Sequence, residues 1–208
     1  MSRKRRKEIR SEMTRIVSRL DPRWLQAASR ELCGNLTKII EEELNDDVEH
    51  VLAWMSYFPG EVDLSSFINQ QLDKRRIYLP RMLPDRSMTF ISIGKDWLNS
   101  MQSSELGILE PGSASGETFD LSWARETVVI APGLAFDREG GRLGRGAGYY
   151  DRFFARGPMM QSTKIGVCWS LQMGEEVPVE SHDVIMDWVC HERGYVKSNF
   201  SFEDDFDE

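Results

Sequence analysis

The stretch RLGRGAGYYDRFF, residues 142–154, places three glycines at alternate positions between two arginines and a Tyr-Tyr-Asp sequence. The glycines remove side chains and permit positive φ, so consecutive backbone N–H groups can converge on an anion at a helix N-terminus. Arg142 and Arg145 add planar guanidinium donors that suit phosphate oxygens. We therefore interpret this stretch as a polyphosphate-binding loop.

Three other interpretations of the glycine pattern are weaker. An isolated glycine repeat is typical of a tight turn, but the flanking arginines favour anion binding. A Walker loop needs GK[ST], which the sequence lacks. A dinucleotide-binding loop needs G-x-G-x-x-G and an acidic residue about twenty positions later, and neither is present.

The segments before this loop predict two helices that open the chain. Apolar residues at helical spacing predict a helix over residues 9–20, and the basic cluster of residues 3–10 lies at its start. Asp21 and Pro22 are typical of a helix N-cap and first helical position, which predicts a second helix. Asp63 is expected to cap a third helix, after a turn at Pro59-Gly60.

Short apolar runs predict strands at 48–58, 76–80, 88–93, 126–132, 164–170 and 186–191. The glycine loop follows the strand at 126–132, and a helix over 149–156 follows the loop. Alternating strands and helices predict an α/β fold of three layers, with a mainly parallel sheet and helices on both faces. Ligands of such folds bind at the carboxyl ends of the strands. Residues 99–122 predict a long functional or mobile loop that contains the apolar sequence GILEP.

Composition limits the class of protein. The 208 residues suit one domain over 1–200 and an acidic tail at 201–208 that we expect to be disordered. The net charge of −8 disfavours a protein that wraps nucleic acid with its whole surface. Three scattered cysteines indicate reduced thiols, and no apolar run suits a secretion signal or a membrane span. We expect a cytoplasmic monomer without nucleic-acid or membrane partners, and we place His50 on a strand surface.

A longer pattern carries a family resemblance. PGLAFDREGGRLGRGAGYYDRFF, residues 132–154, resembles the signature of the 5-formyltetrahydrofolate cyclo-ligase family, also called 5,10-methenyltetrahydrofolate synthetases. Further matches in the family's order are GEVD (60–63), KRRIYLPR (74–81), GILEP (107–111) and VPVESHD (177–183). Together with the basic first helix, the resemblance covers about 190 residues.

The resemblance implies a fold related to sugar-phosphate isomerases and CoA transferases, and an ATP-dependent carbon-nitrogen ligase that uses Mg²⁺. Its substrate would be 5-formyltetrahydrofolate, with or without a polyglutamate tail, and its products 5,10-methenyltetrahydrofolate, ADP and phosphate. The formyl oxygen would attack the γ-phosphate of ATP, and N10 would then close the ring and displace phosphate. Such chemistry depends on positioning and on neutralisation of charge.

The resemblance also implies site residues. Arg145 and Asp151 would be catalytic, and Asp151 and Asp183 would hold Mg²⁺ directly or through water. From the residues alone, Asp151 is equally a first-turn helix carboxylate and Asp183 an exposed loop acid. The residues implied to contact ATP are Arg6, Lys7, Arg10, Arg142, Leu143, Gly144, Arg145, Gly146, Ala147, Gly148, Tyr149 and Tyr150. Family members commonly carry a Lys where this chain has Arg6.

On the folate side, the resemblance assigns Glu61 as the carboxylate that accepts hydrogen bonds from the pterin. The residues implied to contact the substrate are Met55, Phe58, Glu61, Tyr149, Tyr150 and Trp169. Trp169 stands where family members commonly have Phe. The apolar members of this set are also typical of a protein core, and an acid in a turn before a helix is typical of a cap.

Two other functions fit parts of the sequence. A module derived from the same family could bind nucleotide or folate without turnover. Alternatively, residues 3–10 could form an RNA-binding or organelle-targeting arm, whose RNA affinity would fall steeply with salt. The intact 142–151 stretch disfavours the first function, and the acidic net charge disfavours the second.

Overall fold

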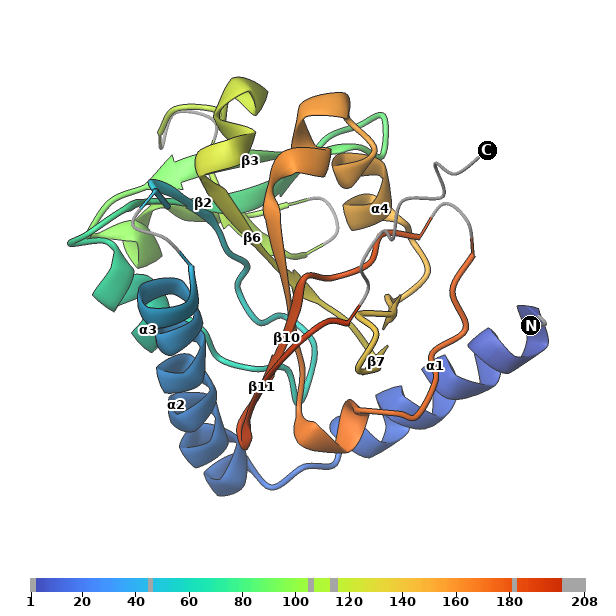
Figure 1. Ribbon diagram of the computed structural model, residues 1–208. Coiled ribbons are helices and arrows are strands. Elements are labelled where there is room, and N and C mark those ends of the chain that lie inside the picture. The colour runs from blue at the N-terminus through green and yellow to red at the C-terminus, as the bar shows by residue number, and fades with distance from the viewer. Residues whose placement is uncertain (1–2, 45–46, 105–106, 113–115, 181–182, 200–208) are drawn as a thin grey trace, which may run out of the picture.

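The computed structural model describes residues 3–44, 47–104, 107–112, 116–180 and 183–199, so the acidic tail lies outside the described residues. Within these ranges the centre is a seven-stranded sheet of order β11-β10-β9-β6-β1-β2-β3 (Figure 1). The parallel strands are β1 (His50–Leu52), β2 (Arg76–Met82), β6 (Thr127–Pro132), β9 (Thr163–Val167) and β10 (Trp188–His191). At the edges, β3 (Met88–Ile93) and β11 (Gly194–Lys197) pair antiparallel with their neighbours. The predicted α/β fold with a mainly parallel sheet is confirmed.

Helices cover both faces of the sheet, as predicted. They are α1 (Arg3–Val17), α2 (Pro22–Lys38), which continues as the π-helical turn η1 (Ile39–Glu43), α3 (Ser65–Gln71) and α4 (Tyr149–Phe154). The 3₁₀ turns are η2 (Trp97–Ser100), η3 (Leu121–Glu126), η4 (Gly157–Gln161) and η5 (Ser170–Gln172). Side chains of α2 and α3 pack in one apolar cluster, and those of α4 and η4 pack in another.

Strand β6 shows why both faces are covered. Val128 and Ile130 belong to the cluster on the α2 and α3 face, whereas Val129 and Ala131 belong to the cluster on the α4 face. Successive side chains of a strand point to opposite faces, so a continuously apolar strand needs a helical layer on each side.

The local signals for helices and turns act as expected. The Asp21 carboxylate accepts hydrogen bonds from the backbone N–H groups of Arg23 (2.8 Å) and Trp24 (3.0 Å) at the start of α2. Asp63 accepts from the backbone N–H of Ser65 (2.9 Å), the first residue of α3, but it does so from one position before the N-cap, which is Leu64 rather than the predicted Asp63. Gly60 has a φ of 81°, and a Cβ there would lie 2.0 Å from the Val17 carbonyl oxygen, so this turn requires glycine.

Two sequence predictions are wrong, one about the extent of a strand and one about a loop. The strand expected over 48–58 is paired only at His50–Leu52, because the chain then leaves the sheet at its carboxyl edge. The described part of residues 99–122 is not all loop, because β4 (Met101–Ser103) and β5 (Leu109–Pro111) pair antiparallel. Strands of three residues are too short to show an alternating pattern.

Further elements were not foreseen. A small hairpin, β7 (Ala135–Phe136) and β8 (Arg142–Leu143), separates β6 from the glycine loop and lies beside α1 (Figure 1). Strand β11 was also missed. His50 is 4% exposed rather than on the surface, because its ring stacks on Trp123 at 4.7 Å between centroids. None of the described helices is both long enough and apolar enough to span a membrane.

Candidate active site

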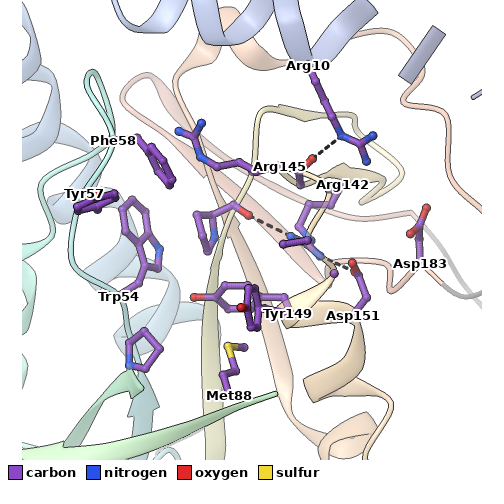
Figure 2. Close-up of a pocket in the computed structure, with 18 of the residues that line it drawn as sticks. Arg10, Trp54, Tyr57, Phe58, Met88, Arg142, Arg145, Tyr149, Asp151 and Asp183 are labelled. Atoms are coloured by element: carbon purple, nitrogen blue, oxygen red, sulfur yellow. Dashed lines mark hydrogen bonds and ion pairs between the residues drawn. The ribbon is translucent and has the colours of Figure 1, made fainter. Parts of the chain in front are cut away.

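A cavity of about 640 Å³ opens at the carboxyl edge of the sheet, where the prediction places the ligand. Its aromatic half is lined by Trp54, Met55, Tyr57, Phe58, Met82 and Met88. Its charged half is lined by the glycine loop of residues 144–148 and by Arg6, Arg10, Arg142, Asp151, Glu180 and Asp183. Figure 2 shows the two halves on opposite sides of one space, with Tyr149 between them. Cavities of this size suit small-molecule ligands.

The glycine loop has the backbone that its sequence predicts. Gly146 and Gly148 have φ values of 99° and 69°, in the left-handed region that residues with a Cβ rarely adopt. A Cβ on Gly148 would lie 2.9 Å from Nη1 of Arg152, which donates to the Ala147 carbonyl at 2.9 Å. A residue with a side chain at position 148 would therefore collide with the Arg152 guanidinium, so the loop needs glycine there.

Arg142 is fixed at the base of the charged half. Its side chain is 4% exposed, and its Nη1 donates to the Pro132 carbonyl at 3.1 Å. Its Nη2 donates to Oδ1 of Asp151 at 2.5 Å, and its guanidinium lies 5.6 Å from the Tyr150 ring centre. The predicted ATP contact and the predicted metal ligand thus form an ion pair between a buried arginine and a partly buried aspartate.

A second ion-pair group joins α1 to the segment before β10. Nη1 of Arg6 lies 2.7 Å from Glu180, and its Nη2 lies 3.0 Å from Asp183. Arg10 donates through Nε to the Gly144 carbonyl at 2.9 Å. Burial and then the positive charge of Arg6 lower the pKa of Arg10, and Asp183, Glu180 and Asp151 oppose this shift. Lys7 is exposed and is not among the residues that line the cavity, so Arg6 is the residue that points inward.

Glu61 organises the aromatic half. One of its oxygens, Oε2, accepts hydrogen bonds from the backbone N–H groups of Tyr57 (2.9 Å) and Phe58 (3.0 Å). The other, Oε1, lies 2.9 Å from Nη2 of Arg145. The guanidinium carbon of Arg145 lies 3.8 Å from the centre of the Phe58 ring. The carboxylate is therefore held from both sides, by the backbone and by a stacked cation.

Besides Lys7, two further predicted contacts do not line this cavity. Trp169 is fully buried, and its indole N–H donates to the Gly60 carbonyl at 2.7 Å, so it supports the turn that carries Glu61. Leu143 is also fully buried, in a small cluster with Ala135 and Val177. The remaining predicted residues, Met55, Phe58, Glu61, Arg142, Gly144, Arg145, Gly146, Ala147, Gly148, Tyr149, Tyr150, Asp151 and Asp183, line the cavity together with Arg6 and Arg10.

The sequence analysis missed several lining residues, among them Arg3, Trp54, Met82, Met88, Ile108 and Glu180. Ile108 lies in GILEP, an apolar sequence within a predicted loop, and this pattern could have identified it as a lining residue. No sequence pattern distinguishes Met82 and Met88 from ordinary apolar residues of a strand.

Asp137 supports the site from outside the cavity and was also missed. It is 4% exposed and accepts hydrogen bonds from the backbone N–H groups of Glu139 (3.1 Å), Gly141 (2.8 Å) and Val177 (2.7 Å). A buried carboxylate with several amide donors is strongly stabilised. Asp137 therefore ties the β7–β8 turn, which leads to Arg142, to the segment that leads to Glu180.

The residues present fit a polyanionic ligand with a hard cation. Within the described ranges, buried polar atoms without a hydrogen-bond partner include Nε of Arg6, Nε1 of Trp54, Nε of Arg142 and the hydroxyl of Tyr150. All four residues line this cavity, and unpaired buried polar groups are costly, so a ligand with acceptor oxygens fits here. The carboxylates of Asp151, Glu180 and Asp183 offer the hard oxygens that Mg²⁺ prefers.

Comparisons with known proteins agree with the motif-level resemblance. The model of the 5-formyltetrahydrofolate cyclo-ligase family matches residues 2–192. The chain is 26% identical to 5-formyltetrahydrofolate cyclo-ligase from Saccharomyces cerevisiae over 204 residues, which cover 87% of this chain and 92% of that protein. It is 31% identical to the Escherichia coli K12 protein of the same name over 136 residues, 65% of this chain and 74% of that one.

The fold is similar to that of 5,10-methenyltetrahydrofolate synthetase from Aquifex aeolicus, solved by NMR. The TM-score is 0.76, the sequence identity is 24%, and the match covers 97% of each chain. At this identity the structural likeness supports the fold alone, whereas the family model spans nearly the whole chain. The chain therefore belongs to the 5-formyltetrahydrofolate cyclo-ligase family, a family of enzymes.

Proposed function

We propose that this protein catalyses the ATP-dependent conversion of 5-formyltetrahydrofolate to 5,10-methenyltetrahydrofolate, with release of ADP and phosphate. One observation carries the proposal beyond family membership. A single cavity joins an aromatic half with a fixed carboxylate to a cationic, glycine-lined half. A planar heterocycle and a polyphosphate can therefore meet in one enclosed space, as the transfer of a phosphoryl group between them requires.

Each half has a role in the proposal. The aromatic half would stack the pterin, and Glu61 would accept its hydrogen bonds. The glycine loop, Arg10 and Arg142 would hold the phosphates of ATP. Asp151 and Asp183 would hold Mg²⁺, which neutralises phosphate charge when bound. Trp169 would act indirectly, through the Gly60 carbonyl.

The chemistry balances in two steps. The formyl oxygen forms a bond to the γ-phosphorus, and the bond from that phosphorus to ADP breaks. N10 then forms a bond to the formyl carbon and gives up its proton, and the carbon–oxygen bond breaks with release of phosphate, which leaves with that proton as hydrogen phosphate. The protein contributes alignment, charge neutralisation by its arginines, and exclusion of water from an activated intermediate.

The test is the absorbance of methenyltetrahydrofolate formed from 5-formyltetrahydrofolate and Mg-ATP, with ADP measured in parallel. We expect one ADP per product formed by the wild-type protein. Asp183→Asn should lower kcat at least about tenfold and raise the Mg²⁺ concentration for half-maximal rate, because one hard ligand is lost. Asp187→Asn is the matched control, since Asp187 pairs with Lys164 outside the cavity and its loss should leave kcat unchanged.

Folded wild-type protein that binds ATP yet forms no product would overturn the proposal in favour of a binding module. Equal losses of kcat in the Asp183→Asn and Asp187→Asn variants would show that Asp183 is not a Mg²⁺ ligand.

A further inference from the structure

Arg145 lies in the part of the cavity that the proposed function assigns to the pterin. Its guanidinium is stacked on the Phe58 ring at 3.8 Å and bonded to Oε1 of Glu61 through Nη2 (2.9 Å) and Nε (3.3 Å). Of the arginines labelled in Figure 2, Arg10 and Arg142 lie on the side of Asp151, whereas Arg145 directs its guanidinium toward Phe58. A cation of the glycine loop thus occupies the aromatic half.

The contacts of Glu61 explain why this occupation matters. Oε2 is engaged by the backbone N–H groups of Tyr57 and Phe58, so the carboxylate has a fixed orientation. Glu61 lines the cavity, and its Oε1 accepts hydrogen bonds from Nη2 and Nε of Arg145. The Glu61 side chain is only 13% exposed. A ligand that needs this carboxylate must therefore displace the arginine.

A guanidinium and a reduced pterin present the same kind of edge. The 2-amino group and N3–H of the pterin form a planar pair of donors attached to a flat ring, which can stack on an aromatic side chain and face a carboxylate. Arg145 satisfies Glu61 and Phe58 in the same manner, by two N–H donors and a stacked planar group. Arg145 thus occupies the positions beside Glu61 and Phe58 that the donor edge of the pterin would take.

We propose, on the basis of the proposed function, that Arg145 is an internal competitor for the pterin subsite and couples folate binding to nucleotide binding. Displaced by the pterin, the Arg145 guanidinium would turn toward the charged half, where nucleotide phosphates attract it. Gly144 and Gly146 flank Arg145, and because glycine adopts a wide range of backbone angles, the backbone can move with the side chain. Phosphates that hold Arg145 leave Glu61 free, so each ligand strengthens the binding of the other.

The test measures the Kd of 5-formyltetrahydrofolate by calorimetry without nucleotide, for wild type, Arg145→Met and Arg10→Met. Removal of the competitor should tighten folate binding by about threefold to tenfold, the value of a partly exposed ion pair and a cation–π contact. Arg10→Met is the matched control, because it removes the same charge from the same cavity while leaving Glu61 paired. Arg10→Met should not tighten folate binding.

Two further arms test the mechanism. Glu61→Gln removes the charge that holds Arg145. In this background, adding Arg145→Met should therefore leave the Kd of 5-formyltetrahydrofolate unchanged. A non-hydrolysable ATP analogue with Mg²⁺ should tighten folate binding to wild type and have no such effect on Arg145→Met. Circular dichroism checks that each variant is folded.

The outcomes separate the two proposals. If wild type turns over and Arg145→Met binds folate no more tightly than Arg10→Met does, the internal-competitor proposal is wrong and the proposed function stands. If wild type binds no 5-formyltetrahydrofolate, both proposals fail. Tightening in Arg145→Met that persists unchanged in the Glu61→Gln background would also overturn the role of Arg145, because Glu61 is the contact for which it competes.

Discussion

Arg142 and Asp151 face each other at opposite ends of the glycine loop, with Nη2 of the guanidinium 2.5 Å from Oδ1 of the carboxylate. Strand β8 carries the arginine and helix α4 carries the aspartate, so the ion pair fixes the distance that the loop must span. The arginine side chain is 4% exposed and the aspartate side chain 23%. The pair therefore holds the backbone of the glycine loop in shape as well as placing charge beside the cavity.

Variants of Asp151 should separate these two roles. Asp151→Ala leaves the Arg142 cation buried with one hydrogen bond to a carbonyl, and we expect a loss of about 1–3 kcal/mol in the free energy of unfolding. Asp151→Asn keeps an acceptor for Arg142 and should lose less stability, while its kcat falls as far as that of Asp151→Ala because a neutral amide is a poor Mg²⁺ ligand. Urea denaturation and steady-state kinetics measure the two effects. Full activity of Asp151→Asn would show that the carboxylate acts only as a support.

A methyl group in the glycine loop should weaken nucleotide binding. Gly148→Ala places a Cβ at a φ of 69° and 2.9 Å from Nη1 of Arg152, and strain of this kind costs about 1–3 kcal/mol. The KM for ATP should rise several-fold. Gly34→Ala is the control: this exposed glycine in α2 has no atom near its Cβ position, so alanine should stabilise the protein by about 0.5–1 kcal/mol and leave KM unchanged. An unchanged KM for ATP in Gly148→Ala would show that the glycine loop does not bind the phosphates of ATP.

Trp169 is expected to act on folate binding through the turn at Gly60. Trp169→Phe keeps most of the aromatic packing but loses the 2.7 Å hydrogen bond, which leaves the Gly60 carbonyl without this donor and costs about 1–3 kcal/mol of stability. Because Glu61 follows this turn, the KM for 5-formyltetrahydrofolate should rise while kcat changes little. Trp24→Phe, which alters the ring that contacts Trp169 at 5.0 Å, is the matched control and should leave this KM unchanged. Equal KM values for both variants would show that the hydrogen bond has no role in binding.

Stability should depend on the protonation of His50. Burial lowers the pKa of His50 below its ordinary value of 6.5, Arg76 lowers it further, and Glu49 and Glu126 oppose the shift. The unfolded chain therefore binds more protons than the folded chain once the pH drops below about 6.5, and the free energy of unfolding should fall there as the pH falls. In His50→Gln this slope should be smaller, even if the protein is less stable at every pH. Urea denaturation between pH about 7.5 and pH about 5 measures the slope, and an NMR titration of the wild-type ring gives the pKa directly. An identical slope in the variant would rule His50 out as its source.

Residue patterns determined much of the architecture. The continuously apolar run at 126–132 predicted a strand buried on both faces, and Val128 and Val129 do pack on opposite sides of it. Asp21 and Pro22 predicted the start of α2, because capping depends only on neighbouring backbone groups. The spacing of glycines and arginines in 142–151 predicted an anion-binding loop, since the chemistry of such a loop is local to the chain.

Only the tertiary structure decided which residues share the cavity. Met82 and Met88 reach it because β2 and β3 pair, and Glu180 reaches it because it pairs with Arg6. Trp169 has an aromatic side chain like that of a ligand contact, yet it lies behind the turn at Gly60.

The sequence by itself therefore determined the fold class, the start of α2 and the glycine backbone of the loop, which depend on periodicity and on near neighbours. The tertiary structure decided that Arg6 of α1 points into the cavity and that Asp137 ties the β7–β8 turn to the segment before Glu180. It also decided the contact between Arg145 and Glu61, two residues that are 84 positions apart in the sequence. Contacts over such separations depend on how several elements pack at once, and no local pattern of residue types records that packing.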